Sequence, residues 1–366
     1  MFKNIYQNKK VIITGNTGFK GAWLSVWLLK LGAKVYGISK DIPTNPSIFE
    51  VCNLKSHLHY FELDIRDNEK LMNVITSIEP DYIFHLAAQP IVSESYQNPI
   101  DTFTSNIIGT ANVLECLRKI NKPCKAIIIT SDKCYENVEW TWGYRENDRL
   151  GGKDPYSASK GAAELIIHSY YESFFKNESS NVQLVSVRAG NVIGGGDWAL
   201  NRIVPDAMRS WSKKQSVIIR SPQATRPWQH VLEPLSGYLV AGMKLTENKN
   251  LSGESFNFGP NADQNHTVLE LLNELSKHWN FSNDFNTIEI QPSIQFHEAG
   301  LLKLNCDKAL HMLNWKPVWN FEDTTKYTSQ WYFDYYNNHQ VNIEYLENQL
   351  NEYLKSATNK NLEWTI

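Results

Sequence analysis

The chain has 366 residues, of which 42% are hydrophobic and 20% charged, and its formal net charge is −3. That balance is typical of a globular protein of one large or two closely associated domains, and it gives no overall field for nucleic acid or an anionic membrane. No apolar run reaches the roughly 20 residues of a membrane span, and residues 1–10 lack the apolar core of a signal peptide. Five scattered cysteines without CxxC spacing predict reduced thiols, a cytoplasmic location and no metal site.

A nucleotide-binding pattern stands near the start of the chain. Residues 10–14 (KVIIT) predict a buried strand, and the amphipathic run 23–31 predicts a helix. Between them lie Gly15, Gly18 and Gly21. Strand, glycine-rich loop and helix form the context in which backbone N–H groups and a helix N-terminus bind a pyrophosphate, although a tight turn that only packs helix on strand would use the same glycines.

The second predicted strand, residues 33–38, ends in Ser39, Lys40 and Asp41. An acidic residue at the end of this strand usually binds the ribose 2′-hydroxyl of NAD. Because Ser39 takes the nearest equivalent position and Asp41 follows two residues later, the pattern leaves the choice between NAD and NADP open.

Strands and helices then alternate as far as residue 188. The predicted strands cover 60–64, 81–86, 125–130 and 182–188, and the predicted helices cover 67–78 and 102–117. The alternation predicts an α/β fold with a Rossmann-type, doubly wound parallel sheet. Small and polar residues stand at the predicted strand ends, where such sheets bind ligands: Gly15, Asp64, Ala87, Ser131 and Gly190.

A further helix is predicted from Asp154, which suits an N-cap, and Pro155, which suits the first helical position. Tyr156 and Lys160 then lie one turn apart on the same face. A cation beside a phenol lowers its pKa from about 10 and makes it usable as a base. On spacing alone, packing and solubility explain such a pair equally well.

The alternation fades in the second half. We expect residues 1–190, with a return segment near 228–245, to form the nucleotide-binding domain, and residues 191–356 to form mainly a smaller mixed α/β substrate domain. The aromatic stretch 327–354 predicts a helix packed on the protein body, and residues 357–366 predict a frayed tail.

Four arginines follow the glycine-rich loop 194–198 within 25 positions: Arg202, Arg209, Arg220 and Arg226. Guanidinium groups bind phosphate oxygens through paired hydrogen bonds, as a nucleotide diphosphate requires. A solvated ion pair is the simpler explanation for Arg209 and Arg220.

Several segments together resemble the extended short-chain dehydrogenase/reductase superfamily, over about residues 9–335. They are TGNTGFKG at 14–21, HLAAQ at 85–89, Asn106 with Gly109 and Thr110, TSD at 130–132, and YSASK at 156–160. Longer segments at 130–137, 140–161, 188–199 and 226–239 are similar to the CDP-glucose 4,6-dehydratase family. Asn257–Pro260 and His297–Ala299 also resemble it, without an assigned role.

The resemblance implies conversion of CDP-D-glucose to CDP-4-keto-6-deoxy-D-glucose and water, with a bound NAD that is recycled. Tyr156 would remove the C4 hydroxyl proton, Lys160 would assist it, Ser131 would share its hydrogen bonds, and Asp132 would protonate the departing C6 hydroxyl. The implied cofactor-binding residues are Gly15, Thr17, Gly18, Phe19, Lys20, Gly21, Asp64, Ile65, Leu86, Ala87, Ala88, Asn106, Tyr156 and Lys160, and the implied substrate-binding residues are Gln89, Asn191, Arg202 and Arg226.

Lys133 departs from the Asp-Glu pair that many nucleotide-sugar 4,6-dehydratases carry. It could act as a neutral base, or remain charged and stabilise the enolate oxygen while another group removes the C5 proton. The alternatives to the dehydratase are a related dehydratase or epimerase and a non-catalytic NAD-binding sensor. A homodimer through the helices of Asn106 and Tyr156 is expected by analogy with the superfamily.

Overall fold

A computed structural model describes residues 1–282, 284–291 and 301–366, so the predicted motif at 297–299 lies outside the described residues. Its centre is a seven-stranded sheet in the order β11-β6-β5-β4-β1-β2-β3, in which every neighbouring pair is parallel. The strands are β1 (Lys10–Thr14), β2 (Lys34–Ser39), β3 (His59–Glu62), β4 (Tyr82–His85), β5 (Cys124–Ile129), β6 (Val182–Ala189) and β11 (Ser255–Phe258). The predicted Rossmann-type α/β sheet is therefore confirmed.

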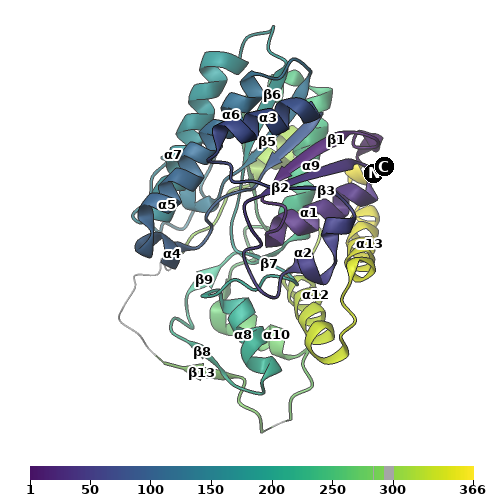
Figure 1. The fold of residues 1–366 in the computed structure, drawn as a ribbon. Coiled ribbons are helices and arrows are strands. Elements are labelled where there is room, and N and C mark those ends of the chain that lie inside the picture. Colours follow the sequence, from purple (N-terminus) through teal and green to yellow (C-terminus); the bar gives the residue numbers. More distant parts are fainter. Residues whose placement is uncertain (283, 292–300) are drawn as a thin grey trace.

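Helices cover both faces of this sheet, as Figure 1 shows. Alternate side chains of β1 point to opposite faces: Ile12 contacts one hydrophobic cluster, and Val11 and Ile13 contact the other. The first face is covered by α3 (Asn68–Ile78), α6 (Gly109–Arg118) and α7 (Pro155–Tyr170). The second is covered by α1 (Phe19–Lys30) and α9 (Leu232–Glu247).

The segment before α6 is less regular than the single predicted helix 102–117. Short helices α4 (Val92–Gln97) and α5 (Pro99–Phe103) lead into a π-helical turn at Thr104–Ile108, and α6 continues from it. The wider turn leaves Asn106 buried between this segment and α7.

A smaller lobe lies below the carboxyl ends of the strands (Figure 1). It contains α8 (Ile203–Ser212), α10 (Val268–Ser276) and short strand pairs. The pairs join β7 (Val192–Ile193) to β10 (Gln229–His230), β8 (Val217–Ile219) to β13 (Ile288–Ile290), and β9 (Thr225–Arg226) to β12 (His266–Thr267).

More of the second half returns to the sheet than the segment predicted near 228–245. Besides α9, strand β11 adds the edge next to β6, with Phe256 opposite Val187. The aromatic stretch forms two helices, α12 (Phe321–Phe333) and α13 (Ile343–Asn359), and α13 packs on α1. The small lobe is thus built from interrupted parts of residues 191–330 rather than from one continuous segment.

The predicted frayed tail is wrong, because residues 357–366 pack on the N-terminus. Trp364 is 1% exposed and stacks on Phe2 with 5.1 Å between ring centroids. Lys3 N donates to Ile366 O at 3.2 Å. The two chain ends therefore lie together at one side of the molecule (Figure 1).

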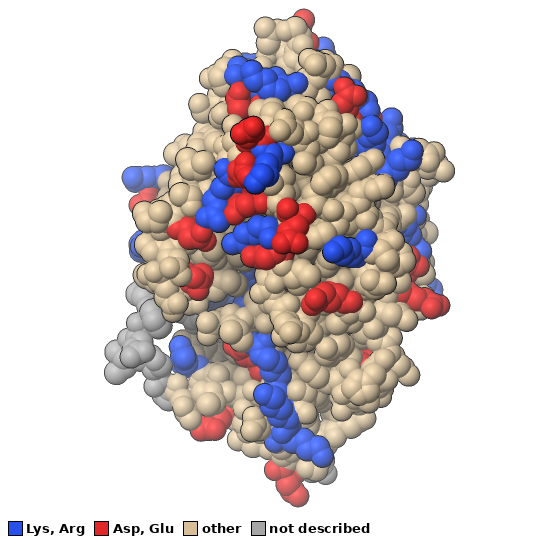
Figure 2. Space-filling view, viewed as in Figure 1, with Lys and Arg blue, Asp and Glu red and all other residues tan. Residues whose placement is uncertain are grey.

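Charges on the face seen in Figure 2 are mixed, with acidic and basic side chains interspersed over the upper part of the molecule. Among the described residues, no helix is both long enough and apolar enough to cross a bilayer.

Candidate active site

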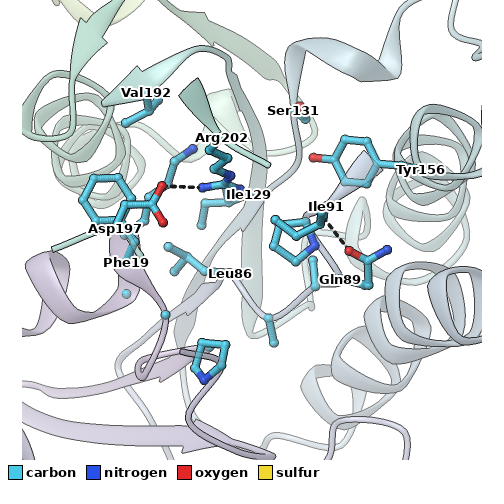
Figure 3. Close-up of a pocket in the computed structure, with 18 of the residues that line it drawn as sticks. Phe19, Leu86, Gln89, Ile91, Ile129, Ser131, Tyr156, Val192, Asp197 and Arg202 are labelled. Atoms are coloured by element: carbon cyan, nitrogen blue, oxygen red, sulfur yellow. Dashed lines mark hydrogen bonds and ion pairs between the residues drawn. The ribbon is translucent and has the colours of Figure 1, made fainter. Parts of the chain in front are cut away.

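One cavity of about 670 Å³ lies at the carboxyl ends of β1, β4, β5 and β6. Its walls come from the glycine loop after β1, the start of α7 and the small lobe. Figure 3 shows Ser131 and Tyr156 on one side of this cavity and the pair Asp197–Arg202 on the other. All five predicted catalytic residues line it: Ser131, Asp132, Lys133, Tyr156 and Lys160.

The glycine loop brings the N-terminus of α1 to the cavity wall. Gly15 has a φ of +76°, and a β-carbon on it would lie 2.8 Å from Ala87 N. A β-carbon on Gly21 would lie 2.1 Å from Gly15 O, so the loop closes only with glycine there. Gly18 is the N-cap of α1 and lines the cavity. The loop, with its free helix N–H groups, fits a pyrophosphate.

At the end of β2, the Ser39 hydroxyl is already hydrogen-bonded within the protein. Ser39 Oγ donates to Asn16 Oδ1 at 2.8 Å and accepts from Thr17 N at 3.3 Å. Lys40 and Asp41 both line the cavity, with Lys40 Nζ 3.7 Å from an Asp41 carboxylate oxygen. Asp41 is therefore the acidic side chain available to a ribose at this edge, two residues beyond the usual position.

The other predicted cofactor residues fall into two groups. Thr17, Phe19, Lys20, Asp64, Ile65, Leu86, Ala87 and Ala88 line the cavity. Asn106 does not. Its amide accepts from Gln89 N at 2.7 Å and donates to Ser159 Oγ at 2.8 Å, so in this structure it holds the β4–α4 loop to α7.

Helix α7 begins where its sequence indicates. Asp154 caps α7 by accepting from Ser157 N at 2.9 Å, and Pro155 takes the first position. This N-cap directs Tyr156 and Lys160, both less than 9% exposed, into the cavity.

The Tyr156 pKa is raised rather than lowered in the protein without ligand, and the effect of Lys160 on it stays a prediction. Burial raises the pKa of Tyr156 to about 12, while a hydrogen bond with Ser131 and the charge of Arg202 lower it only in part. Burial also lowers the pKa of Lys160 to about 8, against the charge of Glu164, which raises it. Desolvation thus outweighs Ser131 and Arg202 in setting the Tyr156 pKa.

A buried ion pair supports α7 from behind. Glu164, one turn beyond Lys160, accepts from Arg188 Nε at 2.9 Å and from Ser186 Oγ at 2.8 Å. Arg188 on β6 donates in turn to Tyr135 Oη at 2.7 Å. The network connects α7, β6 and the segment after β5, so it holds the two halves of the predicted catalytic set together.

The Asp132 carboxyl occupies the space beside Gly190, which has no side chain. Its Oδ1 accepts from Ser131 Oγ at 3.0 Å, and Asn191 Nδ2 lies 3.5 Å from its Oδ2. A β-carbon on Gly190 would lie 1.9 Å from that same Oδ2. The lack of a positive φ at Gly190 means that space, not backbone conformation, requires glycine there.

The predicted substrate-binding residues are divided in the same way. Gln89, Asn191 and Arg202 line the cavity, and Arg226 does not. Arg226 lies on β9 and donates to Thr225 O at 2.8 Å. Arg209 bonds to Trp198 O at 2.9 Å and so supports the 194–198 loop. The role of Arg226 stays a prediction.

Asp197 was missed by the sequence reasoning, which treated 194–198 as a loop with an aromatic anchor. Its Oδ2 accepts from Arg202 Nη1 at 2.8 Å (Figure 3). Lys20 lies nearby, and burial, followed by the charge of Arg202, lowers its pKa to about 8. In the sequence, the only signal for this ion pair was an acidic residue five positions before an arginine.

The cavity therefore joins a dinucleotide-type loop to a buried phenol, an ammonium, a hydroxyl and a carboxyl. The phenol and ammonium suit proton removal from a hydroxyl next to a hydride acceptor. The carboxyl suits protonation of a leaving group. These functions require one ligand to reach both sets of residues.

Comparisons with known proteins follow this geometry. The family described as GDP-mannose 4,6-dehydratase matches residues 12–328. The CDP-glucose 4,6-dehydratase of Salmonella typhimurium is 47% identical over 334 residues, which cover 90% of this chain and 92% of that protein. The dTDP-glucose 4,6-dehydratase of Haemophilus influenzae is 24% identical, covering 88% of this chain and 97% of that protein.

Two solved structures have the same fold. The UDP-glucose 4-epimerase of Thermotoga maritima, solved with UDP-glucose, has a TM-score of 0.77 at 22% identity, covering 89% of this chain and 99% of that one. The dTDP-glucose 4,6-dehydratase of Bacillus anthracis, solved with NAD, has a TM-score of 0.72 at 22% identity, covering 88% of this chain and 96% of that one.

Proposed function

The chain belongs to the family described as GDP-mannose 4,6-dehydratase, and from that premise we propose that it converts CDP-D-glucose to CDP-4-keto-6-deoxy-D-glucose and water. The observation that carries the proposal is the 47% identity to a CDP-glucose 4,6-dehydratase over 90% of the chain. The cavity supports it, because Tyr156, Lys160 and Asp132 line the same space as the glycine loop.

NAD is the proposed cofactor, and when bound it accepts a hydride from the sugar and later returns it. Gly15, Gly18 and the N-terminus of α1 would hold its pyrophosphate, and Asp41 or Asp64 would contact the adenosine end. Ser39, with its hydroxyl already bonded, leaves the ribose contact to its neighbours. An oxidised nicotinamide is positively charged, which favours the ionised form of the buried Tyr156.

The proton transfers assign a role to each catalytic residue. Tyr156 removes the proton of the C4 hydroxyl, with Ser131 within hydrogen-bonding reach of the phenol. The resulting ketone acidifies the C5–H bond, which permits loss of the C6 hydroxyl. Asp132 protonates that hydroxyl, so that it leaves as water. Return of the hydride to C6 and protonation at C5 would complete the product.

Lys133 lines the cavity next to Asp132. A charged Lys133 would stabilise the enolate oxygen, whereas a neutral one would remove the C5 proton. Both roles need the side chain at the sugar, so we propose Lys133 as a catalytic residue. Gln89, Asn191 and Arg202 are the proposed substrate contacts, with Arg226 as a further candidate for the diphosphate.

The test uses purified protein and NAD in D₂O with CDP-, dTDP-, UDP- and GDP-hexoses in separate reactions. Loss of one water and gain of one deuterium with CDP-glucose alone, without net NADH, is the expected result. Net NADH would indicate a simple dehydrogenase, and an unchanged mass with inverted C4 would indicate an epimerase. NAD binding without turnover of any sugar would favour a non-catalytic sensor.

We also propose a homodimer through α5, α6 and α7. Apolar side chains are exposed on this surface, with Ile100 72% and Leu165 60% exposed, and Ile108 and Phe174 also open. Leu165 thus lies on the outer face of α7, where an apolar side chain suits an interface with a second copy. All five cysteines are free thiols, which supports the proposal of a cytoplasmic location.

Leu165→Lys should convert the dimer to a monomer, because a charge replaces an apolar contact at the interface. Light scattering after size exclusion measures the mass. Met312→Lys, which changes an exposed apolar side chain on a different helix, should leave the dimer intact. A wild-type monomer would rule this proposal out.

A further inference from the structure

After the proposed reaction, Tyr156 holds a proton that Asp132 needs for the next turnover. At the start, Tyr156 must be a phenolate and Asp132 a neutral carboxyl. Tyr156 gains the C4 hydroxyl proton, and Asp132 gives its proton to the departing water. The C5 proton is removed and replaced, and the hydride leaves C4 and arrives at C6. After one turnover Tyr156 is therefore protonated and Asp132 ionised, so one proton must pass from the first to the second.

Ser131 lies between these two groups. Its Oγ donates to Asp132 Oδ1 at 3.0 Å, and its side chain lies close enough to the phenol of Tyr156 to lower the pKa of that phenol. Figure 3 shows the Tyr156 hydroxyl directed towards Ser131. A serine hydroxyl both donates and accepts, so it can take a proton from one neighbour while it gives its own to the other.

The surroundings favour an internal path over exchange with water. Tyr156, Ser131 and Asp132 are each at most 8% exposed, before any ligand enters the cavity. The position of Ser131 is also constrained, because its Oγ accepts from Lys133 N at 3.2 Å and caps the turn after β5. Gly190, behind Asp132, contributes no side chain that could relay a proton.

The other charged groups near Ser131 do not link Tyr156 to Asp132. Lys160 lies one turn from Tyr156 and could carry the phenol proton away, but the anion that affects it most is Glu164, which is paired with Arg188. Arg202 stays protonated beside Asp197. Lys20 is a third cation at the cavity wall, where its pKa is affected by the charges of Arg202, Asp132, Lys160 and Asp197.

We propose that Ser131 returns a proton from Tyr156 to Asp132 at the end of each turnover, which closes the catalytic cycle without exchange with solvent. The inference rests on the proposed dehydratase function. In this cycle Tyr156 and Asp132 share one proton across the serine. Binding of the oxidised cofactor favours the phenolate of Tyr156 from which chemistry starts.

The first measurement follows protons rather than product. Wild-type protein with NAD and CDP-glucose is mixed in weakly buffered solution that contains a pH indicator, and the trace is recorded through the first turnovers. An internal return predicts no transient uptake or release. A transient of one proton per site in the wild type would overturn the proposal.

The second measurement compares Ser131→Ala with Ser131→Thr, which keeps a hydroxyl. In Ser131→Ala the later turnovers should be about tenfold or more slower than the first. Added imidazole should accelerate only these later turnovers. Ser131→Thr should show neither effect. Equal slowing of first and later turnovers in Ser131→Ala, with no response to imidazole, would assign the serine to substrate binding alone.

These outcomes are separate from failure of the proposed function. If the wild type forms no product from CDP-glucose, the dehydratase proposal fails first. If the wild type turns over and Ser131→Ala shows no first turnover, the wild-type proton trace still decides, because a flat trace supports the internal return and a one-proton transient excludes it.

Discussion

At the scale of single residues, the site depends on space as much as on functional groups. Asp132 keeps its position because Gly190 has no side chain, and the glycine loop closes because Gly21 has no β-carbon to overlap Gly15 O. Tyr156 and Lys160 show how strongly burial acts, since it moves their pKa values in opposite directions, towards the neutral form of each.

Gly190→Ala should separate the two halves of the reaction. A β-carbon there would displace the Asp132 carboxyl by about 1 Å or more, and misplacement of that size costs about a hundredfold. Water elimination should slow by that factor, while C4 oxidation continues and reduced cofactor accumulates at 340 nm.

Gly259→Ala is the matched control for this prediction. The nearest atom to its added β-carbon is Cys306 Sγ at 3.5 Å, an ordinary contact, so activity should be unchanged. Equal loss of oxidation and elimination in Gly190→Ala would contradict the assignment of Asp132 to the second half.

At the scale of elements, α7 carries Tyr156, Lys160 and Glu164 at successive turns, and β6 supplies Arg188 to hold the last of them. The cap at Asp154 sets where the helix starts and so where Tyr156 enters the cavity. Helix and sheet together place the proposed base, Tyr156, and the proposed acid, Asp132, at the same cavity.

The dependence of kcat/KM on pH should show the ionisation of Lys160. The Tyr156 pKa of about 12 makes kcat/KM rise with pH through the neutral range, because more phenolate forms. Lys160 is charged below its pKa of about 8 and neutral above it, so the support it gives the phenolate is lost there. We expect the rise to bend near pH 8 in the wild type.

Lys160→Met should lower kcat/KM by roughly 10²-fold or more and remove the bend, leaving a steady rise. Thermal unfolding and NAD binding of this variant provide the control for folding. A bend at the same pH in Lys160→Met would assign it to another group.

At the scale of the whole molecule, both chain ends stabilise the nucleotide-binding half. The C-terminal helix α13 packs on α1, and Trp364 fills a space between Phe2 and Trp27. The sheet itself is completed by β11 from the second half. The nucleotide-binding half therefore depends on distant parts of the chain.

Trp364→Ala should lower the free energy of unfolding by about 3–5 kcal/mol, because it leaves a large cavity beside α1. Urea unfolding measures the change. Ile366→Ala, at a side chain that is 80% exposed, should have little effect. Equal stability of the two variants would mean that the tail contributes no packing energy.

The sequence alone determined the parts of this protein that depend on local pattern. Residues 10–14, 125–130 and 182–188 are short apolar runs, and each is a strand of the parallel sheet within a residue or two. The N-cap at Asp154 begins a helix where the sequence predicts it, and the helix predicted at 67–78 begins with a cap at Asp67. The family resemblance, supported by long segments with rare residues, pointed to many of the residues that line the cavity, although Asn106 and Arg226 lie outside it.

Only the tertiary structure decided features that join distant segments or depend on burial. The sequence could not place Arg226 outside the cavity, connect Asp197 to Arg202, add β11 to the sheet or pack Trp364 on Phe2. It also could not give the pKa of Tyr156, because spacing shows the neighbouring cation and leaves the cost of desolvation unknown. Contacts over long separations and removal of water are properties of the folded chain, so only the fold could determine them.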